Sequence, residues 1–535
     1  MQTASASRPQ CRWRLLLLCG ILFEVFLLTL CAFLPEGSSL ASEIRNYCLL
    51  IHSPLLWMFS RLMGSDDWLL QISGVLLILF WMAVFWAFLF YWILRMWTWL
   101  QVRLGISPRQ KFIVRCGFGF VGAVVLALTI VAALPDRATP DRATPFTASP
   151  EVKSAVEGNT AFALDLYQKL KEQPGNLFFS PYSISTALAM TYAGARNQTE
   201  SEMARTLHFS QPQTNVHAAF GTLAARMNAV QRWNRITLAT ANSLWCQQDY
   251  RFANTFLDLV RYHYDGEARQ VDFRHSAQAA GSEINEWVEQ RTRGKIKGVI
   301  GPGQITPDTR LILCNAIYFK GKWQTQFKTG ETKPMDFHVN TNETVTVPMM
   351  LQTSELRMTY NDEGSVEMLE LPYSGTDLSM IILLPMFMPY VPGFEQDNLP
   401  DLEQKLTAEN LHAWLGKLDQ TGLHKTAVSL PRFATTQTFD LANELKSLGI
   451  SSAFNDSADF SGMESTTNLF ISDVIHKAFV EVNEAGTEAA AVTWGQAKTK
   501  GGPERFIVDH PFIFLIRENG SGTILFLGRV VDPTK

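Results

Sequence analysis

Three apolar segments long enough to cross a membrane lie within the first 134 residues of this chain. They cover about residues 14–34, 69–94 and 112–134, and inside them the only charged residues after Arg14 are Glu24 and Arg115. About 20 apolar residues at 1.5 Å rise span a hydrocarbon core of about 30 Å. We therefore expect residues 1–134 to form a membrane module with two or three transmembrane helices, which contacts membrane lipid.

The remainder of the chain has the mixed composition of a globular domain. Residues 135–150 contain a tandem PDRAT repeat rich in proline, which predicts an extended spacer. Residues 151–535 then form one large domain. Hydrophobic residues make up 47% of the chain and its net charge is -4, so bulk charge excludes a nucleic-acid-binding protein and the hydrophobic content excludes a disordered chain.

Basic residues in the short flanks of the apolar segments predict the orientation. They gather before the first segment and between the second and third, at Arg8, Arg12, Arg14, Arg95, Arg103, Arg109 and Lys111. We expect the N-terminus to be cytoplasmic and the large domain to lie outside the cytoplasm, at the cell surface or in a periplasm. Alternatively, the first segment, which ends in SSLAS, is a cleaved signal, and the domain is secreted if the other segments are not retained.

Hydrophobic periodicity places helices early and strands late in the large domain. Apolar residues recur every four positions through AFALDLYQKL, up to Pro174, and a second helical pattern runs through SEINEWVEQRTRGK. Strand-like runs are LILCNAIYF (311–319), DLSMIILLP (377–385), PFIFLIR (511–517) and TILFLGRVV (523–531). Since strands and helices do not alternate, we expect an α+β domain with a large, mostly antiparallel sheet, and Cys314 buried in its core.

Motifs for catalysis or metal binding give no assignment. The sequence holds no G-x-S-x-G and no H-E-x-x-H, and its ten histidines show no ligand spacing. The glycine pattern GFGFVG (117–122) lies inside the third apolar segment and predicts helix packing there rather than nucleotide binding. We expect neither an enzyme nor a cofactor.

Residues 487–498 alternate in a way that fits a strand better than a loop. Every charged or bulky residue falls on the face with Glu488, Ala490 and Trp494, whereas the other face holds only small uncharged residues, Thr487, Ala489, Ala491, Thr493, Gly495 and Ala497. Such a strand could enter a crowded sheet with its small face inward. A flexible alanine-rich loop is the alternative explanation.

Several blocks of the large domain resemble the serpin family. NLFFSPYSISTALAMTYAGARNQTESEM (176–203), LILCNAIYFKGKW (311–323) and FIVDHPFIFLIRENGSGTILFLGRVVDP (506–533) are similar to family signatures in the family's order. The resemblance implies three β-sheets, about nine helices and an exposed reactive-centre loop. It also implies a suicide mechanism, in which a serine protease cleaves the loop and the freed strand inserts into the central sheet before the acyl bond is hydrolysed.

The resemblance assigns the hinge of that loop to residues between Glu484 and Thr493. Its members here are Glu484, Gly486, Thr487, Glu488, Ala489, Ala490, Ala491 and Thr493. Family spacing counted from Gly486 and from Pro511 gives the same reactive bond, Lys500-Gly501, with Lys498 as the alternative. A lysine there implies a trypsin-like target protease, captured as a covalent acyl complex.

Polar residues beneath the central sheet also follow from the resemblance. Ser180, Ser183, Asn315 and His476 match the family's shutter, where strands part, and Trp323 matches the tryptophan of its breach. We expect a monomer, with loop-sheet polymers as its aberrant assembly. The principal hypothesis is a membrane-tethered inhibitory serpin; the alternative is a non-inhibitory binding module or chaperone on the same scaffold, on the outer face of the membrane.

Overall fold

A computed structural model describes residues 146–234, 236–375, 377–386, 399–463, 469–486 and 502–535. The predicted membrane module and most of the predicted spacer therefore lie outside the described residues. Within them, no helix combines the length and apolar character needed to cross a bilayer. The end of the predicted spacer belongs to the folded domain, because Phe146 packs on the core and lies 5.5 Å from the Arg226 guanidinium.

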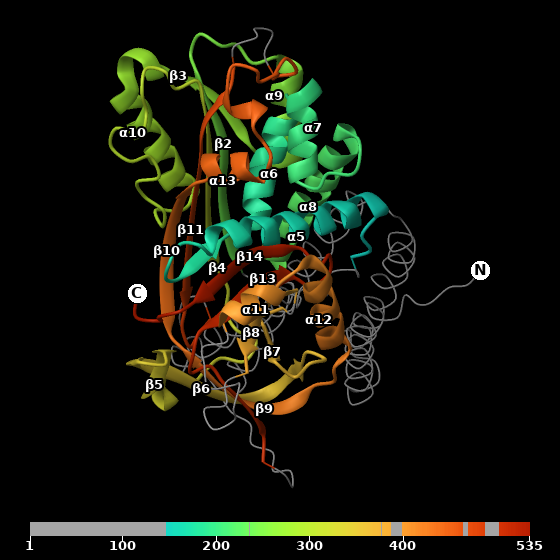
Figure 1. Ribbon diagram of the computed structural model, residues 1–535, viewed down its shortest axis with the longest axis vertical. Coiled ribbons are helices and arrows are strands. Elements are labelled where there is room, and N and C mark those ends of the chain that lie inside the picture. The colour runs from blue at the N-terminus through green and yellow to red at the C-terminus, as the bar shows by residue number, and fades with distance from the viewer. Residues whose placement is uncertain (1–145, 235, 376, 387–398, 464–468, 487–501) are drawn as a thin grey trace, which may run out of the picture. The chain divides into compact units, whose positions relative to one another are not determined.

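Nine α-helices, α5 to α13, occur in the described part of the chain (Figure 1). The first follows a Ser149 N-cap and a proline at its first turn, and the periodic residues predicted for it are buried. The bounds are α5 Pro150–Leu170, α6 Pro181–Tyr192, α7 Asn197–Thr206, α8 Gln213–Asn234, α9 Asn254–Tyr264, α10 Phe273–Arg291, α11 Leu399–Lys405, α12 Ala408–Gln420 and α13 Ala442–Leu448, with 3₁₀ turns at Thr329–Glu331 and Ser452–Phe454.

A five-stranded sheet with the order β10-β11-β4-β2-β3 forms one half of the domain. Its strands are β2 Thr237–Gln247, β3 Glu267–Val271, β4 Leu311–Lys320, β10 Phe433–Asp440 and β11 Ile471–Val482. The central neighbours β4 and β11 run parallel, and the pairs Cys314 with Ile475 and Asn315 with His476 face each other across this seam. We refer to the β4–β11 ladder as the seam below.

The remaining strands form a nine-stranded sheet. They are β1 Leu177–Phe179, β5 Lys333–Asn340, β6 Glu343–Tyr360, β7 Val366–Pro372, β8 Leu378–Pro385, β9 His424–Pro431, β12 Glu504–Ile507, β13 Phe512–Glu518 and β14 Ile524–Val530. Two of the three expected sheets are joined here, because β6 is 18 residues long and pairs with β5 and β9 along its first part and with β7 along its last. Among the described residues, the three expected sheets therefore form two hydrogen-bonded networks, because two of them share β6.

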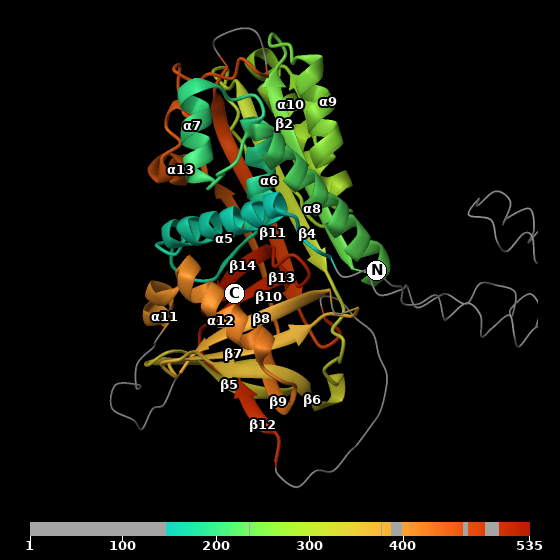
Figure 2. The same ribbon diagram turned by 90° about the vertical axis from the view of Figure 1, so that its right-hand side faces the viewer.

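Both faces of the five-stranded sheet are covered in its centre (Figures 1 and 2). Along β4, Leu313 and Ile317 face the main core, while Ile312, Cys314 and Tyr318 face a second cluster that includes α10. This double burial explains why the LILCNAIYF run is apolar throughout instead of alternating. The prediction that Cys314 is buried is confirmed, and burial raises the pKa of its thiol to about 12.

Candidate functional site

The seam leads directly to the predicted hinge. Strand β11 ends at Val482, and a tight turn follows in which the Asn483 and Gly486 backbones exchange hydrogen bonds of 2.8 and 3.1 Å. The described chain stops at Gly486 and resumes at residue 502, just before β12. The predicted hinge residues from Thr487 to Thr493 and the predicted bond Lys500-Gly501 lie in the gap between them, outside the described residues.

Glu484 fastens this turn to its surroundings. Its carboxylate accepts hydrogen bonds from the Arg432 guanidinium, with Nε at 2.8 Å from each oxygen, and from the Thr332 hydroxyl at 2.5 Å. Its backbone oxygen accepts from the Phe327 amide at 2.9 Å. Burial alone would raise the pKa of Glu484, but the hydrogen bonds from Arg432 and Thr332 hold it below its ordinary value of 4.5.

Gly486 is required by a close approach of two backbones. Its φ is +127°, and a Cβ built there would lie 2.2 Å from the Gly321 carbonyl oxygen and 2.5 Å from the Lys322 Cα. No side chain fits in that space, so only glycine allows the turn to lie against residues 321–323. The hinge glycine assigned by resemblance thus has a physical reason.

Trp323 lies against the same turn. Its indole N–H donates to the Asn483 carbonyl at 3.0 Å and its backbone N–H donates to the Ala485 carbonyl at 3.1 Å. The ring stacks on Tyr373 with centroids 4.6 Å apart. The structure therefore brings Trp323, Glu484 and Gly486 together at one end of the seam.

Farther along the seam, the four predicted shutter residues form one buried polar cluster. His476 Nδ1–H donates to Asn315 Oδ1 at 2.5 Å, and His476 Nε2 accepts from the Ser180 amide at 3.1 Å. The Asn315 amide group donates to Ser183 Oγ at 2.5 Å, and Ser180 Oγ donates to the Leu525 carbonyl at 2.6 Å. His476 connects β11 to β4 and, through Ser180, to the start of α6.

Burial keeps His476 neutral. The ring has no exposed surface, and its loss of solvation lowers its pKa from 6.5 to about 3. Both ring nitrogens are engaged in the neutral form, with one donating and the other accepting. The cluster is therefore fully formed at neutral pH, and it must be disrupted whenever β4 and β11 separate.

Three members of the site were missed by sequence reasoning. Asn242 of β2 accepts from Asn315 and from Ser183 Oγ, which extends the shutter to a third strand. Arg432 and Thr332 hold the Glu484 carboxylate. Asn242 lies within TLATANSLWCQ, where no pattern marks it, and the Glu484 partners are 52 and 152 residues distant in the sequence.

Among the described residues, no group of three or more histidine, cysteine, aspartate or glutamate side chains is arranged to hold a metal ion. At the seam, β4 and β11 are joined by backbone hydrogen bonds between two parallel strands. If the two strands separate, each can form the same kind of bonds with a new strand placed between them.

Comparison with known proteins matches the large domain to one family. The family model described as Serpin (serine protease inhibitor) matches residues 157–533. A leukocyte elastase inhibitor from Sus scrofa is 44% identical over 379 residues, covering 70% of this chain and 98% of the relative, and the one from Homo sapiens is 41% identical over 380 residues with the same coverage. Because those relatives consist almost entirely of the matched region, the shared fold forms without an N-terminal module.

Solved structures agree in fold. Human thyroxine-binding globulin complexed with thyroxine superposes with a TM-score of 0.65 at 31% identity, covering 72% of this chain and 100% of that one. Uncleaved ovalbumin superposes with a TM-score of 0.63 at 31% identity, covering 71% and 100%. Together with the seam, the hinge turn and the shutter, these matches place the chain in the serpin family of serine protease inhibitors, and not among enzymes.

Proposed function

We propose that this chain is a membrane-tethered inhibitory serpin that traps trypsin-like serine proteases as a covalent acyl complex. The observation that carries the proposal is the closed parallel seam, with the hinge turn at the end of one of its two strands. A strand that turns back at Asn483–Gly486 runs antiparallel to β11. Because β4 is parallel to β11, the same strand is antiparallel to both, and the seam is a site for strand insertion.

The hinge turn also fixes a register for insertion. Asn483 already pairs with Gly486, so continuation of this hairpin pairs residue 487 with Val482, 489 with Val480 and 491 with Ala478. Those three β11 side chains are buried against the main core. Residues opposite each other in a ladder share a face, so Thr487, Ala489 and Ala491 enter the core side. The small face of the predicted strand is the one that this register turns inward.

The same register explains two further residues. Thr493 falls opposite His476, between the ring and Asn315, where its hydroxyl can replace the hydrogen bond that the parting strands lose. Trp494 falls opposite Ile475 on the other face, which packs against the cluster containing α10. The bulk of Trp494 is thereby kept out of the main core.

Insertion is energetically favourable on this account. A new strand of about 12 residues paired on both sides adds a dozen or more hydrogen bonds beyond those broken at the seam. At about 0.5–1.5 kcal/mol net each, the release is on the order of 10 kcal/mol. That amount is comparable with the entire stability of an ordinary domain, and it is the work available to displace an acylated protease.

The preference for trypsin-like proteases rests on Lys500, which family spacing places before the reactive bond. A lysine side chain pairs with the carboxylate in the specificity pocket of such proteases. The similar elastase inhibitors carry a different target in their name, so the residue before the bond needs a direct test. We expect Lys500→Glu to lower the rate of trypsin inhibition at least about 100-fold, and the matched Lys498→Glu to lower it much less. The reverse ranking would move the bond to Lys498.

The membrane anchor and the extracytoplasmic location rest on the three apolar segments and their basic flanks. Tethering would keep the inhibitor at the surface that it protects. The test is to treat intact cells with an added protease and to extract their membranes with alkaline carbonate. The proposal requires the domain to be protease-accessible and the chain to remain in the membrane pellet; release into the supernatant would contradict the anchor.

A non-inhibitory binding function is the second candidate. It is favoured by the similarity to thyroxine-binding globulin, whose solved structure contains thyroxine, and by the glycines at 501 and 502 that replace the small hydroxyl residue usual after the bond. The two candidates differ after cleavage of the loop. With a release on the order of 10 kcal/mol, insertion should raise the melting temperature of a domain of this size by about 10 °C or more, whereas a binding module without insertion shows no such rise.

A further inference from the structure

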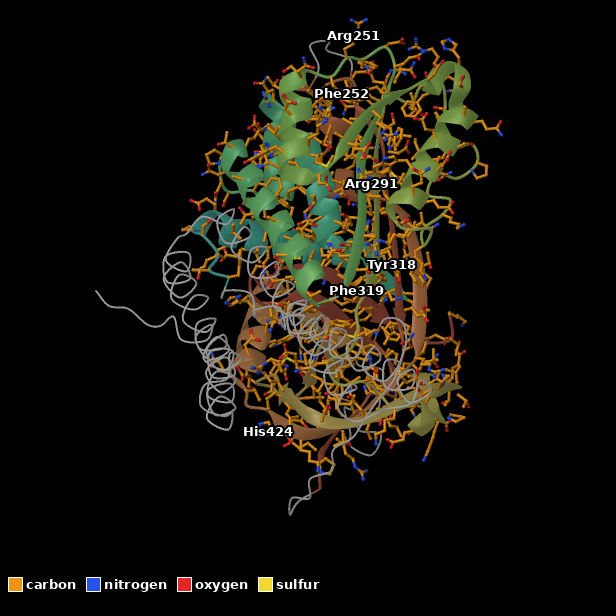
Figure 3. The ribbon with its side chains drawn as sticks, turned by 180° about the vertical axis from the view of Figure 1, so that it is seen from behind. Arg251, Phe252, Arg291, Tyr318, Phe319 and His424 are labelled. Carbon is orange, nitrogen blue, oxygen red and sulfur yellow. The ribbon has the colours of Figure 1, made fainter. Side chains whose placement is uncertain are left out.

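A cavity of about 420 Å³ lies between α9, β3 and the end of α10, two strands away from β4. This volume is in the range of small-ligand sites. Its walls come from three consecutive elements of the chain, and Arg291 at the end of α10 is labelled in Figure 3. The lining residues are Leu257, Val260, Arg261, Asp265, Gly266, Glu267, Ala268, Arg269 and Arg291.

Two of the arginines at this cavity are held by aromatic faces. The Arg269 guanidinium lies 5.5 Å from the ring centroid of Trp245 and 5.8 Å from that of Trp287, and Arg291 lies 5.5 Å from Trp287. Both tryptophans are buried and meet edge to face at 5.9 Å. These cation–π contacts restrict the guanidinium groups, which reduces the entropy that a ligand must overcome to align them.

The guanidinium groups retain unused donors. Glu267 is contacted by Arg269 through Nε at 2.8 Å and Nη2 at 2.6 Å, and it also accepts from Arg291. Arg261 lies 3.8 Å from Asp258 and is 70% exposed. Each guanidinium carries five N–H groups, so those bonds leave several donors at the cavity without a partner among the described residues. Three guanidinium groups and two carboxylates, Asp265 and Glu267, line the cavity, so the lining itself has one positive charge in excess, with Asp258 beside Arg261 outside it.

Apolar side chains form the smaller part of the lining. Val260 is buried, whereas Leu257 and Ala268 are partly exposed beside it. A simple inorganic anion would leave these side chains uncovered, whereas a ligand with both an anionic head and a short apolar group would contact both parts of the lining.

We propose that the cavity between α9, β3 and α10 binds a carboxylate attached to a short apolar group. The carboxylate accepts N–H bonds from Arg261 and Arg291, in the bidentate geometry that guanidinium groups favour, and the apolar group covers Leu257. A free amphipathic acid and the acidic side chain of a peptide share this chemistry. The site is separate from the hinge and shutter and does not depend on inhibition.

Calorimetric titration of residues 146–535 tests the assignment. The probes are octanoate and the peptide acetyl-Leu-Glu-Leu-amide, with octanamide, acetate and acetyl-Leu-Gln-Leu-amide as controls that lack the charge or the apolar group. Binding of either charged probe should weaken about tenfold in Arg291→Gln and in Arg261→Gln. Arg274→Gln is the matched control, because Arg274 is 45% exposed and paired with Asp249 but lies outside the cavity lining.

The outcomes separate the sources of the ligand. Octanoate binding that depends on Arg261 and Arg291 supports the site with a free acid as its ligand, and peptide binding with that dependence supports it with a protein partner. The proposal is overturned if neither probe binds below about 10 mM, if octanamide binds as tightly as octanoate, or if the Arg291→Gln and Arg274→Gln variants bind alike.

Discussion

Glu484 anchors the turn that follows β11 through hydrogen bonds to Arg432, Thr332 and Phe327. The Glu484 side chain is 8% exposed and that of its partner Arg432 is 40% exposed, so the pair is neither a surface ion pair nor a fully buried one. The resemblance located Glu484, Gly486 and His476 from their own sequence blocks, but it did not locate Arg432, Thr332 or Asn242. Partners of this kind are brought together only by the folded topology, because their sequence neighbours carry no distinguishing pattern.

Removal of the Glu484 partner should loosen the hinge. We expect Arg432→Gln to lower stability by about 1–2 kcal/mol, less than for a fully buried pair because Arg432 is partly exposed. The lowered pKa of Glu484 makes the stability of the wild type depend on pH. The stabilisation from Glu484 is complete above pH 4.5 and is lost as pH falls through its lower folded pKa. This loss should be smaller in the Arg432→Gln variant. Urea unfolding at pH 7 and pH 3.5 measures both.

A matched control separates hinge effects from simple loss of an ion pair. Arg357 is 39% exposed and pairs with buried Glu370 on β7, away from the turn. Both variants should lose stability, but only Arg432→Gln should form loop-sheet polymers faster on mild heating. Equal polymerisation of the two variants would show that the Glu484 pair does not restrain the hinge.

The lowered pKa of His476 predicts that the folded protein loses stability at acidic pH. Its folded pKa of about 3 lies below the unfolded value of 6.5, so the unfolded state binds more protons between these values, and stability falls as pH decreases from 6.5 toward 3. The slope from one such group is roughly 1.4 kcal/mol per pH unit. His217, whose pKa burial lowers to about 4, adds a slope of the same sign.

The contribution of His476 is isolated by a difference measurement. His476→Gln offers an amide that can donate to Asn315 and accept from Ser180 without titrating. The stability of this variant should fall less steeply between pH 6.5 and pH 4 than that of the wild type, as measured by urea unfolding. Parallel slopes would mean that the pKa of His476 is the same in the folded and unfolded protein, which would contradict its desolvation.

Strands that are covered on both faces are the ones that the sequence made visible, and β4 of the seam is one of them. Strands β4, β8, β13 and β14 were predicted from sequence because their burial on both faces makes them continuously apolar. Strand β5 was not predicted, since its first four residues, Lys333 to Asp336, are all exposed and give no hydrophobic signal.

The segment after α10 is attached to the seam by a hydrogen bond. Lys477 of β11 donates to the Lys297 carbonyl at 2.8 Å.

The proposed register predicts which residues of the inserted strand face the core, and substitutions on the two faces test it. A charged side chain at residue 487 falls on the core face opposite Val482, where burial of an unpaired charge is very unfavourable. We expect Thr487→Arg to convert the inhibitor into a substrate, with nearly all of the serpin cleaved and no stable complex. The ratio of complex to cleaved product on a denaturing gel measures this partition.

The neighbouring position is the control for that variant. Glu488→Arg places the same side chain on the opposite face, next to Glu481 in the proposed register, and should leave most of the inhibition intact. If the two variants behave alike, the register drawn from the Asn483–Gly486 hairpin is wrong.

At the scale of the whole molecule, the α+β class, the serpin fold and the shutter cluster were accessible from sequence, mainly through resemblance. The merging of two sheets through β6 was not, because a long strand that changes partners along its length looks the same in sequence as two shorter ones. The cavity beside α9 was also missed, since its arginines come from three elements and acquire a common surface only after folding.

Strand insertion after cleavage is tested by mixing residues 146–535 with an excess of trypsin and separating the products on a denaturing, reducing gel. The suicide mechanism predicts a band near the summed masses of the two proteins, stable to boiling, with cleavage mapped after Lys500. Complete cleavage at Lys500 with no such band would contradict insertion as the outcome of cleavage and would favour the binding function.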